Sequence, residues 1–196
     1  KYQALVVMDD SHATGILGKT GRGTHQLAGV KNRIDFITST LGKALGGASG
    51  GFIVSSKKNI EFLRQRSRNY IFSNTLSPVI ATVTAFVIDN ISANLIAHQL
   101  LWENTRYFRK GMQEAGFEIS KTEHPIIPIM LCDANVAKNM AKALFLEGIY
   151  VVGFGYPVVP LNQARIRVQI SASHTHKDLD QAIKAFTKIG KKMRVI

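Results

Sequence analysis

The chain has 196 residues, 45% of them hydrophobic and 19% charged, which is the balance of an ordinary globular protein of one or two domains. No apolar run approaches the roughly 20 residues of a membrane helix, so we expect no membrane partner. The formal charge is +12. The basic residues are spread along the chain without interleaved aromatic residues or a recognisable motif. We therefore expect no nucleic acid partner, and either a solvated basic surface or an attraction for an anionic ligand.

The first predicted strand covers residues 5–8, an apolar run typical of a strand that is buried on both faces. A parallel strand needs neighbours and a covering helix, yet the chain opens with Lys1 just before this run. We therefore expect the chain to be a piece of a longer protein. Asp9, Asp10 and His12 follow the strand directly. One carboxylate there can keep a ring nitrogen protonated while the histidine binds the same ligand. Two acids after a strand are also typical of a helix cap or a solvated turn.

A glycine-rich loop over residues 15–29, with a short helix at 24–27, leads to a second predicted strand at residues 30–38. Lys43 follows in the segment STLGKALGG, which begins at Ser39. Open α/β sheets bind ligands at the carboxyl ends of their strands, and glycines let a ligand approach closely. A lysine shielded from water there becomes a nucleophile suited to Schiff-base formation.

Lys43 has two other interpretations. A phosphate-binding P-loop is excluded, because Ile37 and Ala44 stand where that loop requires a glycine and a hydroxyl. A surface lysine in a glycine turn is the usual interpretation of an isolated Gly-Lys pair. The acid–histidine stretch favours a third. Pyridoxal 5'-phosphate (PLP) needs a lysine for its aldehyde and an acid for its pyridine nitrogen, so the two strand ends together predict a PLP site.

After the lysine segment, the pattern predicts a strand at residues 50–54 and a helix at 60–68 that Asn59 caps. Residues 73–75 are a polar turn, and Pro78 then lies in the first turn of a helix.

In that helix, apolar residues recur at helical spacing from residue 79 to residue 91, and a break is predicted over 90–93. A second helix follows at 94–115 and ends at Gly116. We place a domain boundary near residue 95.

The remaining sequence predicts a small α/β domain, with a helix at 134–147 and strands at 117–119, 126–131, 149–152 and 165–171. Cys132, the single cysteine, cannot form an internal disulfide. It follows an apolar run, so we expect it to be buried and the compartment to be reducing.

Arg165 and Arg167 alternate with apolar residues and therefore share one face of their strand. A guanidinium fork there could hold a carboxylate, and surface charge on a strand is the alternative. His174 and His176 lack a second cluster of ligands, so we expect no metal. Thr175 instead begins the last helix.

Together, these stretches resemble the α-oxoamine synthases, PLP enzymes of the fold-type I aminotransferase class. The resemblance runs almost from end to end and is carried by residues 9–15, 21–23, 39–51, 63–68, 72–74, 156–160 and 164–167. It implies an α/β fold in which residues 1–95 are the C-terminal half of the PLP-binding large domain. Residues 96–196 would be a small C-terminal domain. The N-terminal half of the large domain, with the group stacked on the cofactor ring, would be absent from this chain.

The resemblance also implies roles for individual residues. Lys43 would bind PLP covalently and act in catalysis, and Asp9 would hold the ring nitrogen. His12 would lie at the phenolic oxygen, also as a catalytic residue, and Thr40 near the phosphate. Arg167 would clamp the carboxylate of the amino acid, with Arg165 as the less favoured candidate.

Ser73 and Asn74 would, by the same resemblance, reach the cofactor phosphate of a neighbouring subunit. This implies a homodimer with shared active sites.

Within the family, the arginine-rich segment 63–68 and residues 154–160 are most similar to members that condense glycine with acetyl-CoA. Such an enzyme makes 2-amino-3-oxobutanoate and CoA, in glycine and threonine metabolism. It would lie in the cytoplasm of a bacterium or in the mitochondrion of a eukaryote. Members that use alanine and a longer acyl-CoA are one alternative, which Ser11 and the arginine-rich segment disfavour. A non-catalytic basic binding fragment is another.

Overall fold

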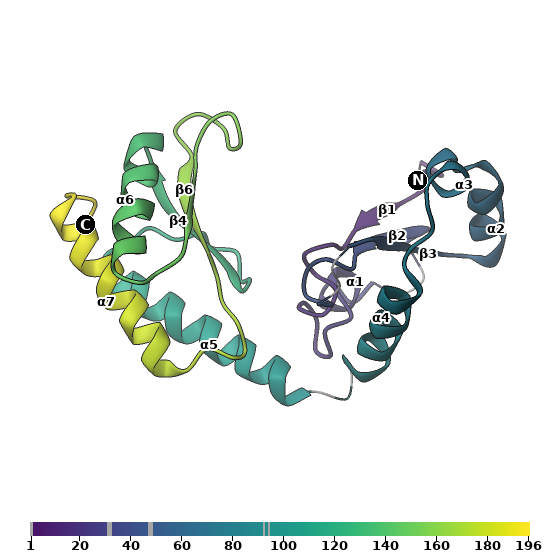
Figure 1. Ribbon diagram of the computed structural model, residues 1–196, viewed down its shortest axis with the longest axis horizontal. Helices are drawn as coiled ribbons and strands as arrows, with labels where there is room; N and C mark the ends of the chain where they lie inside the picture. The colour runs from purple at the N-terminus through teal and green to yellow at the C-terminus, as the bar shows by residue number, and fades with distance from the viewer. Residues whose placement is uncertain (1, 31–32, 47–48, 92, 94) are drawn as a thin grey trace. The chain divides into compact units, whose positions relative to one another are not determined.

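The computed structural model describes residues 2–30, 33–46, 49–91, 93 and 95–196. Predicted features that fall on Lys1, residues 31–32, 47–48, residue 92 and Asn94 lie outside this part of the chain. The chain separates into two compact units, residues 1–95 (unit 1) and residues 96–196 (unit 2), drawn in Figure 1.

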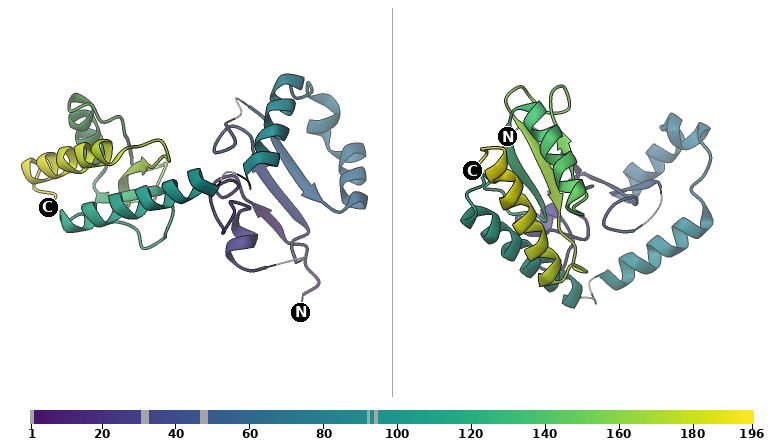
Figure 2. Two further views of the ribbon diagram at one scale, coloured as in Figure 1. Left: turned by 90° about the horizontal axis from the view of Figure 1, so that it is seen from below. Right: turned by 60° about the vertical axis from the view of Figure 1, so that its left-hand side comes forward.

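Unit 1 contains a three-stranded sheet in the order β1-β2-β3, with β1 at Val7–Asp9, β2 at Phe36–Thr40 and β3 at Gly51–Ser55. The three strands lie side by side in Figure 2, left. β1 and β2 are parallel, because the long segment between them supplies the crossover that parallel strands need. β2 and β3 are antiparallel, joined by the short lysine loop. The helices are α1 (Thr24–Leu27), α2 (Lys57–Arg66), α3 (Arg68–Phe72) and α4 (Pro78–Ile91).

The prediction of a first strand buried on both faces is wrong. β1 starts two residues later than expected, and Leu5 and Val7 are 70% and 65% exposed. β1 is an edge strand of the described sheet, paired with β2 alone. An apolar run indicates that its side chains need other side chains to pack against. Within the described residues of unit 1, the side chains of Leu5 and Val7 remain largely exposed.

The predicted start of the helix after β3 is also wrong. α2 begins at Lys57, because the hydroxyl of Ser56 accepts a hydrogen bond from the backbone N–H of Asn59 and so caps the helix. The side chain of Asn59 instead donates to Ser55 at 2.9 Å. The helix stops at Arg66, and a separate short helix, α3, follows where the sequence suggested a single helix and an irregular segment.

Unit 2 is an antiparallel three-stranded sheet in the order β4-β6-β5, covered on one face by helices (Figure 1; Figure 2, right). Alternate residues of β4 and β6 are buried, as expected when helices cover one face of a sheet. The strands are β4 (Ile126–Cys132), β5 (Val152–Phe154) and β6 (Ala164–Gln169). The helices are α5 (Leu95–Glu114), α6 (Ala134–Leu146) and α7 (His176–Lys192), which confirms the three helices predicted for this half.

The core of unit 2 is built around aromatic side chains from its helices. Phe186 of α7 packs edge-to-face against Phe108 of α5 at 6.4 Å and against Phe117 at 5.9 Å, measured between ring centroids. Phe108 and Phe186 are fully buried. Burial of each such side chain contributes about 1.5–3 kcal/mol, so these contacts fix the helices on the sheet that carries Arg167.

Three predictions for unit 2 need correction. The strand expected at 149–152 is β5 at Val152–Phe154, since its register is set by pairing with β6. Residues 117–119 contribute only an isolated bridge, between Ile119 and Ile129. Cys132 is exposed rather than buried, because the register of β4 shifts after Met130 and the backbone of Cys132 has a φ of 61°.

Candidate active site

The carboxyl ends of β1 and β2 lie at the same edge of the unit 1 sheet. The two strands are parallel, with Asp9 opposite Thr38, and the N–H of Asp10 donates to the carbonyl of Thr38 at 2.8 Å. Asp9 is the last residue of β1, and β2 ends at Thr40, three residues before Lys43. The pairing therefore brings Asp9 and the lysine loop to one edge of the sheet.

Asp9 presents an exposed carboxylate at this edge, and it accepts a hydrogen bond from the backbone N–H of Ser11 at 2.8 Å. Hydrogen bonds from Ser11 lower the pKa of Asp9 below its ordinary value of 3.8, and the charges of Lys43 and His12 add smaller contributions in the same direction. The carboxylate is thus ionised at neutral pH. An ionised carboxylate is the partner that a protonated pyridine nitrogen requires.

The lysine loop is anchored by two buried leucines. Leu41 and Leu45 are 3% and 2% exposed, whereas Lys43 between them is exposed. The N–H of Leu41 donates to Gly50 at 3.0 Å, and the N–H of Gly46 donates to the carbonyl of Lys43 at 2.9 Å. The described residues therefore hold the loop by its two leucines and its backbone. We expected the amine of Lys43 to be shielded from water, but the described residues leave it exposed.

Thr40 and His12 also lie near this edge. The hydroxyl of Thr40 donates to Gly50 at 3.3 Å and accepts from the N–H of Gly42 at 3.2 Å, so it is held within the lysine loop. His12 lies in the turn after β1 with its side chain exposed.

Ser73 and Asn74 follow α3 and are exposed. Ser73 caps that helix, its N–H donating to Asn69 at 3.2 Å. The described contacts of unit 1 do not bring these two residues to the Asp9–Lys43 edge.

Sequence reasoning missed the polar residues behind this edge. Asp10 is 1% exposed and Ser39 is 6% exposed, and Thr14 joins them through hydrogen bonds. Their one signal in the sequence was the second acid after the strand, which was compatible with a helix cap. Asp10 does accept from the backbone N–H of Thr24 at 3.1 Å, at the first residue of α1.

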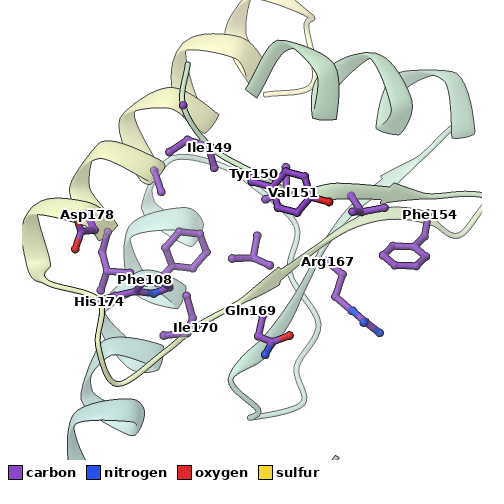
Figure 3. Close-up of a pocket in the computed structure, with 15 residues that line it drawn as sticks. Phe108, Ile149, Tyr150, Val151, Phe154, Arg167, Gln169, Ile170, His174 and Asp178 are labelled. Atoms are coloured by element: carbon purple, nitrogen blue, oxygen red, sulfur yellow. The ribbon is translucent and has the colours of Figure 1, made fainter. Parts of the chain in front are cut away.

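Arg167 lies in unit 2, on the central strand β6, with its side chain exposed. Its guanidinium lies over the ring of Phe154, 5.1 Å from the centroid. Both residues line one end of a pocket of about 410 Å³, with His174 and Asp178 at the other end (Figure 3). The guanidinium is thus oriented by an aromatic ring and remains open to an anionic ligand.

Arg165 shares the strand face of Arg167, but its guanidinium is already used. Its Nε donates to the carbonyl of Gln163 at 2.9 Å, and its Nη2 donates to the side chain of the same residue at 3.2 Å. This occupancy makes Arg165 a poorer partner for a carboxylate than Arg167.

Across the described ranges, no group of three or more His, Cys, Asp or Glu residues is placed to hold a metal ion. Taken singly, none of the helices in those ranges is long and apolar enough to cross a membrane.

Residues 1–186 match the family described as aminotransferase class I and II, and the chain belongs to that family. It is 53% identical over all 196 residues to 2-amino-3-ketobutyrate coenzyme A ligase from Escherichia coli K12, covering 49% of that protein. It is 48% identical over 191 residues, 97% of the chain, to the mitochondrial enzyme of the same name from Homo sapiens, covering 46% of it. It is also 42% identical over 196 residues to 8-amino-7-oxononanoate synthase from Thermosipho melanesiensis, covering half of that protein.

Among solved structures, SPT (serine palmitoyltransferase) with a PLP internal aldimine superposes with a TM-score of 0.94 at 31% identity. The match covers 99% of this chain and 49% of that one. These similarities confirm the predicted relationship to the α-oxoamine synthases and the α/β fold class, with the chain matching the C-terminal portion of such enzymes. The family is PLP-dependent. The chain spans about half the length of the curated relatives it matches.

Proposed function

We propose that the protein containing this chain is a PLP-dependent acyltransferase that condenses glycine with acetyl-CoA to give 2-amino-3-oxobutanoate and CoA. The observation that carries this proposal is the 53% identity to 2-amino-3-ketobutyrate coenzyme A ligase, which extends over the whole chain. The geometry of unit 1 supports the cofactor. An ionised carboxylate, an imidazole and an amine at one edge of a sheet are the donor set that PLP needs.

Lys43 would hold the cofactor covalently, and the Asp9 carboxylate would hold a proton at the ring nitrogen. His12 would bind the phenolic oxygen and Thr40 the phosphate. Bound PLP supplies an electron sink for negative charge that develops at the α-carbon of the amino acid. The firmly anchored lysine loop supports this assignment, since a nucleophile must be held in place to act repeatedly.

The chain's own residues would then act on glycine. The guanidinium of Arg167 would bind its carboxylate. The amine of Lys43, released when the amine of glycine takes its place on the cofactor, would take a proton from the α-carbon. The α-carbon would then form a bond to the acetyl carbonyl carbon while the thioester C–S bond breaks. The departing CoA thiolate would take up the proton that Lys43 removed, so that CoA leaves as the thiol. His12 would contribute to catalysis by fixing the charge on the phenolic oxygen.

Assembly and location extend the proposal. Residues 1–95 would belong to the large PLP-binding domain and residues 96–196 to the small domain. Ser73 and Asn74, exposed after α3, would reach the phosphate of a neighbouring subunit in a homodimer. The protein would be cytoplasmic in a bacterium or mitochondrial in a eukaryote, since relatives of both kinds match.

The test is borohydride reduction of the complete protein that contains this chain, followed by peptide mapping. Reduction fixes the cofactor to its lysine, so we expect a pyridoxyl group on the peptide with Lys43 and none in the Lys43→Ala variant. The variant should lose turnover by roughly 10³-fold or more, because nucleophile and base are removed together. Full turnover in Lys43→Ala would contradict the proposal.

The main competitor is an enzyme that uses alanine and a longer acyl-CoA, favoured by the 42% identity to 8-amino-7-oxononanoate synthase. A substrate panel separates the two. Glycine with acetyl-CoA should give the higher kcat/KM, whereas a preference for alanine with a long acyl-CoA would support the competitor. Absence of PLP and of turnover with either pair would favour a non-catalytic fragment.

A further inference from the structure

A cluster of polar side chains lies directly behind the proposed cofactor edge, and none of the assigned site residues belongs to it. Its centre is Asp10, which follows Asp9 and is 1% exposed. The carboxyl group accepts from the backbone N–H of Thr24 at 3.1 Å. The hydroxyl of Thr14 donates to the carbonyl of Asp10 at 3.1 Å. A buried carboxyl group without a hydrogen-bond donor such as Thr24 would be strongly destabilising. Together, the two bonds hold Thr14 and Thr24 against Asp10 and so close residues 10–24 into a turn.

The close approach of Gly23 shows how tightly this turn is packed. A Cβ built on Gly23 would lie 1.7 Å from the carboxyl oxygen Oδ2 of Asp10, and the φ of Gly23 is +107°. Both the space and the backbone conformation therefore require glycine. The carboxyl group of Asp10 fills the place that a side chain at this position would take.

A hydroxyl pair connects this turn to the strand that precedes the lysine loop. The hydroxyl of Ser39, which is 6% exposed, donates to the hydroxyl oxygen of Thr14 at 2.8 Å. Ser39 is the fourth residue of β2 and lies next to Thr40. The chain of bonds thus runs from Ser39 through Thr14 to Asp10. It joins the segment that leads to Lys43 to the segment that carries Asp9.

We propose that Asp10, Thr14 and Ser39 are positioning residues that hold the Asp9–His12 turn and the lysine loop at a fixed separation for the cofactor. The inference rests on the proposed function, since it takes Asp9 and Lys43 as the two contacts of PLP. The three side chains do not reach the ligand edge themselves. They act through Asp9, which adjoins Asp10, and through the lysine loop, which adjoins Ser39.

The chain offers a matched set of variants. Thr14→Val keeps the shape of the side chain but removes the hydroxyl, and Thr14→Ser restores it. Ser39→Ala removes the other member of the pair. Ser55→Ala is the control, because Ser55 also bonds through its hydroxyl in the same sheet, to Asp35 and Asn59. It lies opposite Phe36, at the other end of β2 from the lysine loop.

Three quantities are measured in the complete protein that contains this chain. They are the dissociation constant of PLP, the pH titration of its visible absorbance band, and amide hydrogen exchange of residues 10–24 in the apoprotein. Thr14→Val and Ser39→Ala should each weaken PLP binding about tenfold, shift the titration and speed exchange. The double variant should lose less than the product of the two single losses, because each single substitution already removes the bond between Ser39 and Thr14. Thr14→Ser and Ser55→Ala should match the wild type within about twofold.

The outcomes separate this inference from the proposed function. If the wild type takes up no PLP at Lys43, the proposed function is wrong. The claim that the cluster places the cofactor contacts is then wrong as well, but the claim that it holds residues 10–24 is tested separately. Exchange in the apoprotein then still decides whether the cluster holds the turn. If the wild type binds PLP but Thr14→Val binds it equally well with an unchanged titration, the positioning role is wrong. An equal loss in Ser55→Ala would also overturn it, because the effect would then belong to the whole sheet.

Discussion

Arg167 is the residue whose assignment can be tested most selectively, because Arg165 on the same strand face provides an internal control. Replacing Arg167 with lysine keeps the positive charge but removes the planar fork and its packing on Phe154, where the guanidinium lies 5.1 Å from the ring centroid. We expect Arg167→Lys to raise the KM for glycine about tenfold and to leave the KM for acetyl-CoA unchanged.

Arg165→Lys should change the KM for glycine by less than about twofold, since the Arg165 guanidinium is already bonded to Gln163. Steady-state kinetics with each substrate varied in turn make the comparison. If the two variants raised the KM for glycine equally, the effect would come from the positive charge of the strand face, and the clamp assignment would be wrong.

In unit 1, the sequence predicted the exposed site residues Asp9 and Lys43 but not the buried polar cluster behind them. Asp9 and Lys43 each follow an apolar run, so their place at the ends of strands follows from local pattern alone. The bonds from Asp10 to Thr24 and from Ser39 to Thr14 join residues 14 and 25 positions apart. No periodicity encodes such contacts, because they join residues that only the folded chain brings together.

At the scale of the element, α7 has a reciprocal cap at its first turn. The hydroxyl of Thr175 accepts from the N–H of Asp178, and the Asp178 carboxylate accepts from the N–H of Thr175 at 2.8 Å. Thr175→Ala should lower the free energy of unfolding by about 1 kcal/mol, and Thr175→Ser should restore most of it. Urea unfolding at neutral pH measures both, and an equal loss in the serine variant would contradict the capping role.

The same cap predicts how stability depends on pH. Hydrogen bonds from Thr175 lower the pKa of Asp178 from 3.8, so the folded state favours the ionised carboxylate. Its stabilisation is complete well above pH 3.8 and disappears as the pH falls through the lower pKa of the folded state. The difference in the free energy of unfolding between wild type and Asp178→Asn should therefore shrink as the pH is lowered below 3.8.

Long helices and short strands differed in how well the sequence predicted them. α6 and α7 bury residues at helical spacing over several turns. The predicted range of α6, residues 134–147, is close to the observed one, and Thr175 caps α7 at the predicted start. β5 is three residues long, and its position is set by pairing with β6, so the apolar pattern alone placed it too early. The start of α2 depended on one hydroxyl, that of Ser56, in competition with Asn59 as the capping side chain.

At the scale of the whole molecule, the excess of basic residues bears on which of the two proposed substrates the protein would attract. The formal charge is +12, from 25 basic and 13 acidic side chains. Acetyl-CoA is an anion with several phosphate charges, whereas glycine is a zwitterion without net charge. A surface of net positive charge raises the local concentration of an anion, and salt weakens this attraction because the Debye length falls from about 30 Å at 0.01 M to about 10 Å at 0.1 M.

Raising the ionic strength between these limits should therefore increase the KM for acetyl-CoA severalfold and change the KM for glycine by less than about twofold. Equal responses of the two KM values would mean that the basic excess has no part in acyl-CoA binding. The alternative, a basic module for nucleic acid, makes a different prediction, because contacts to phosphates along a duplex release counterions and give a steep dependence on salt. Retention of the protein on duplex DNA at about 0.15 M salt would support that alternative, and it would do so most strongly for a protein without PLP on Lys43.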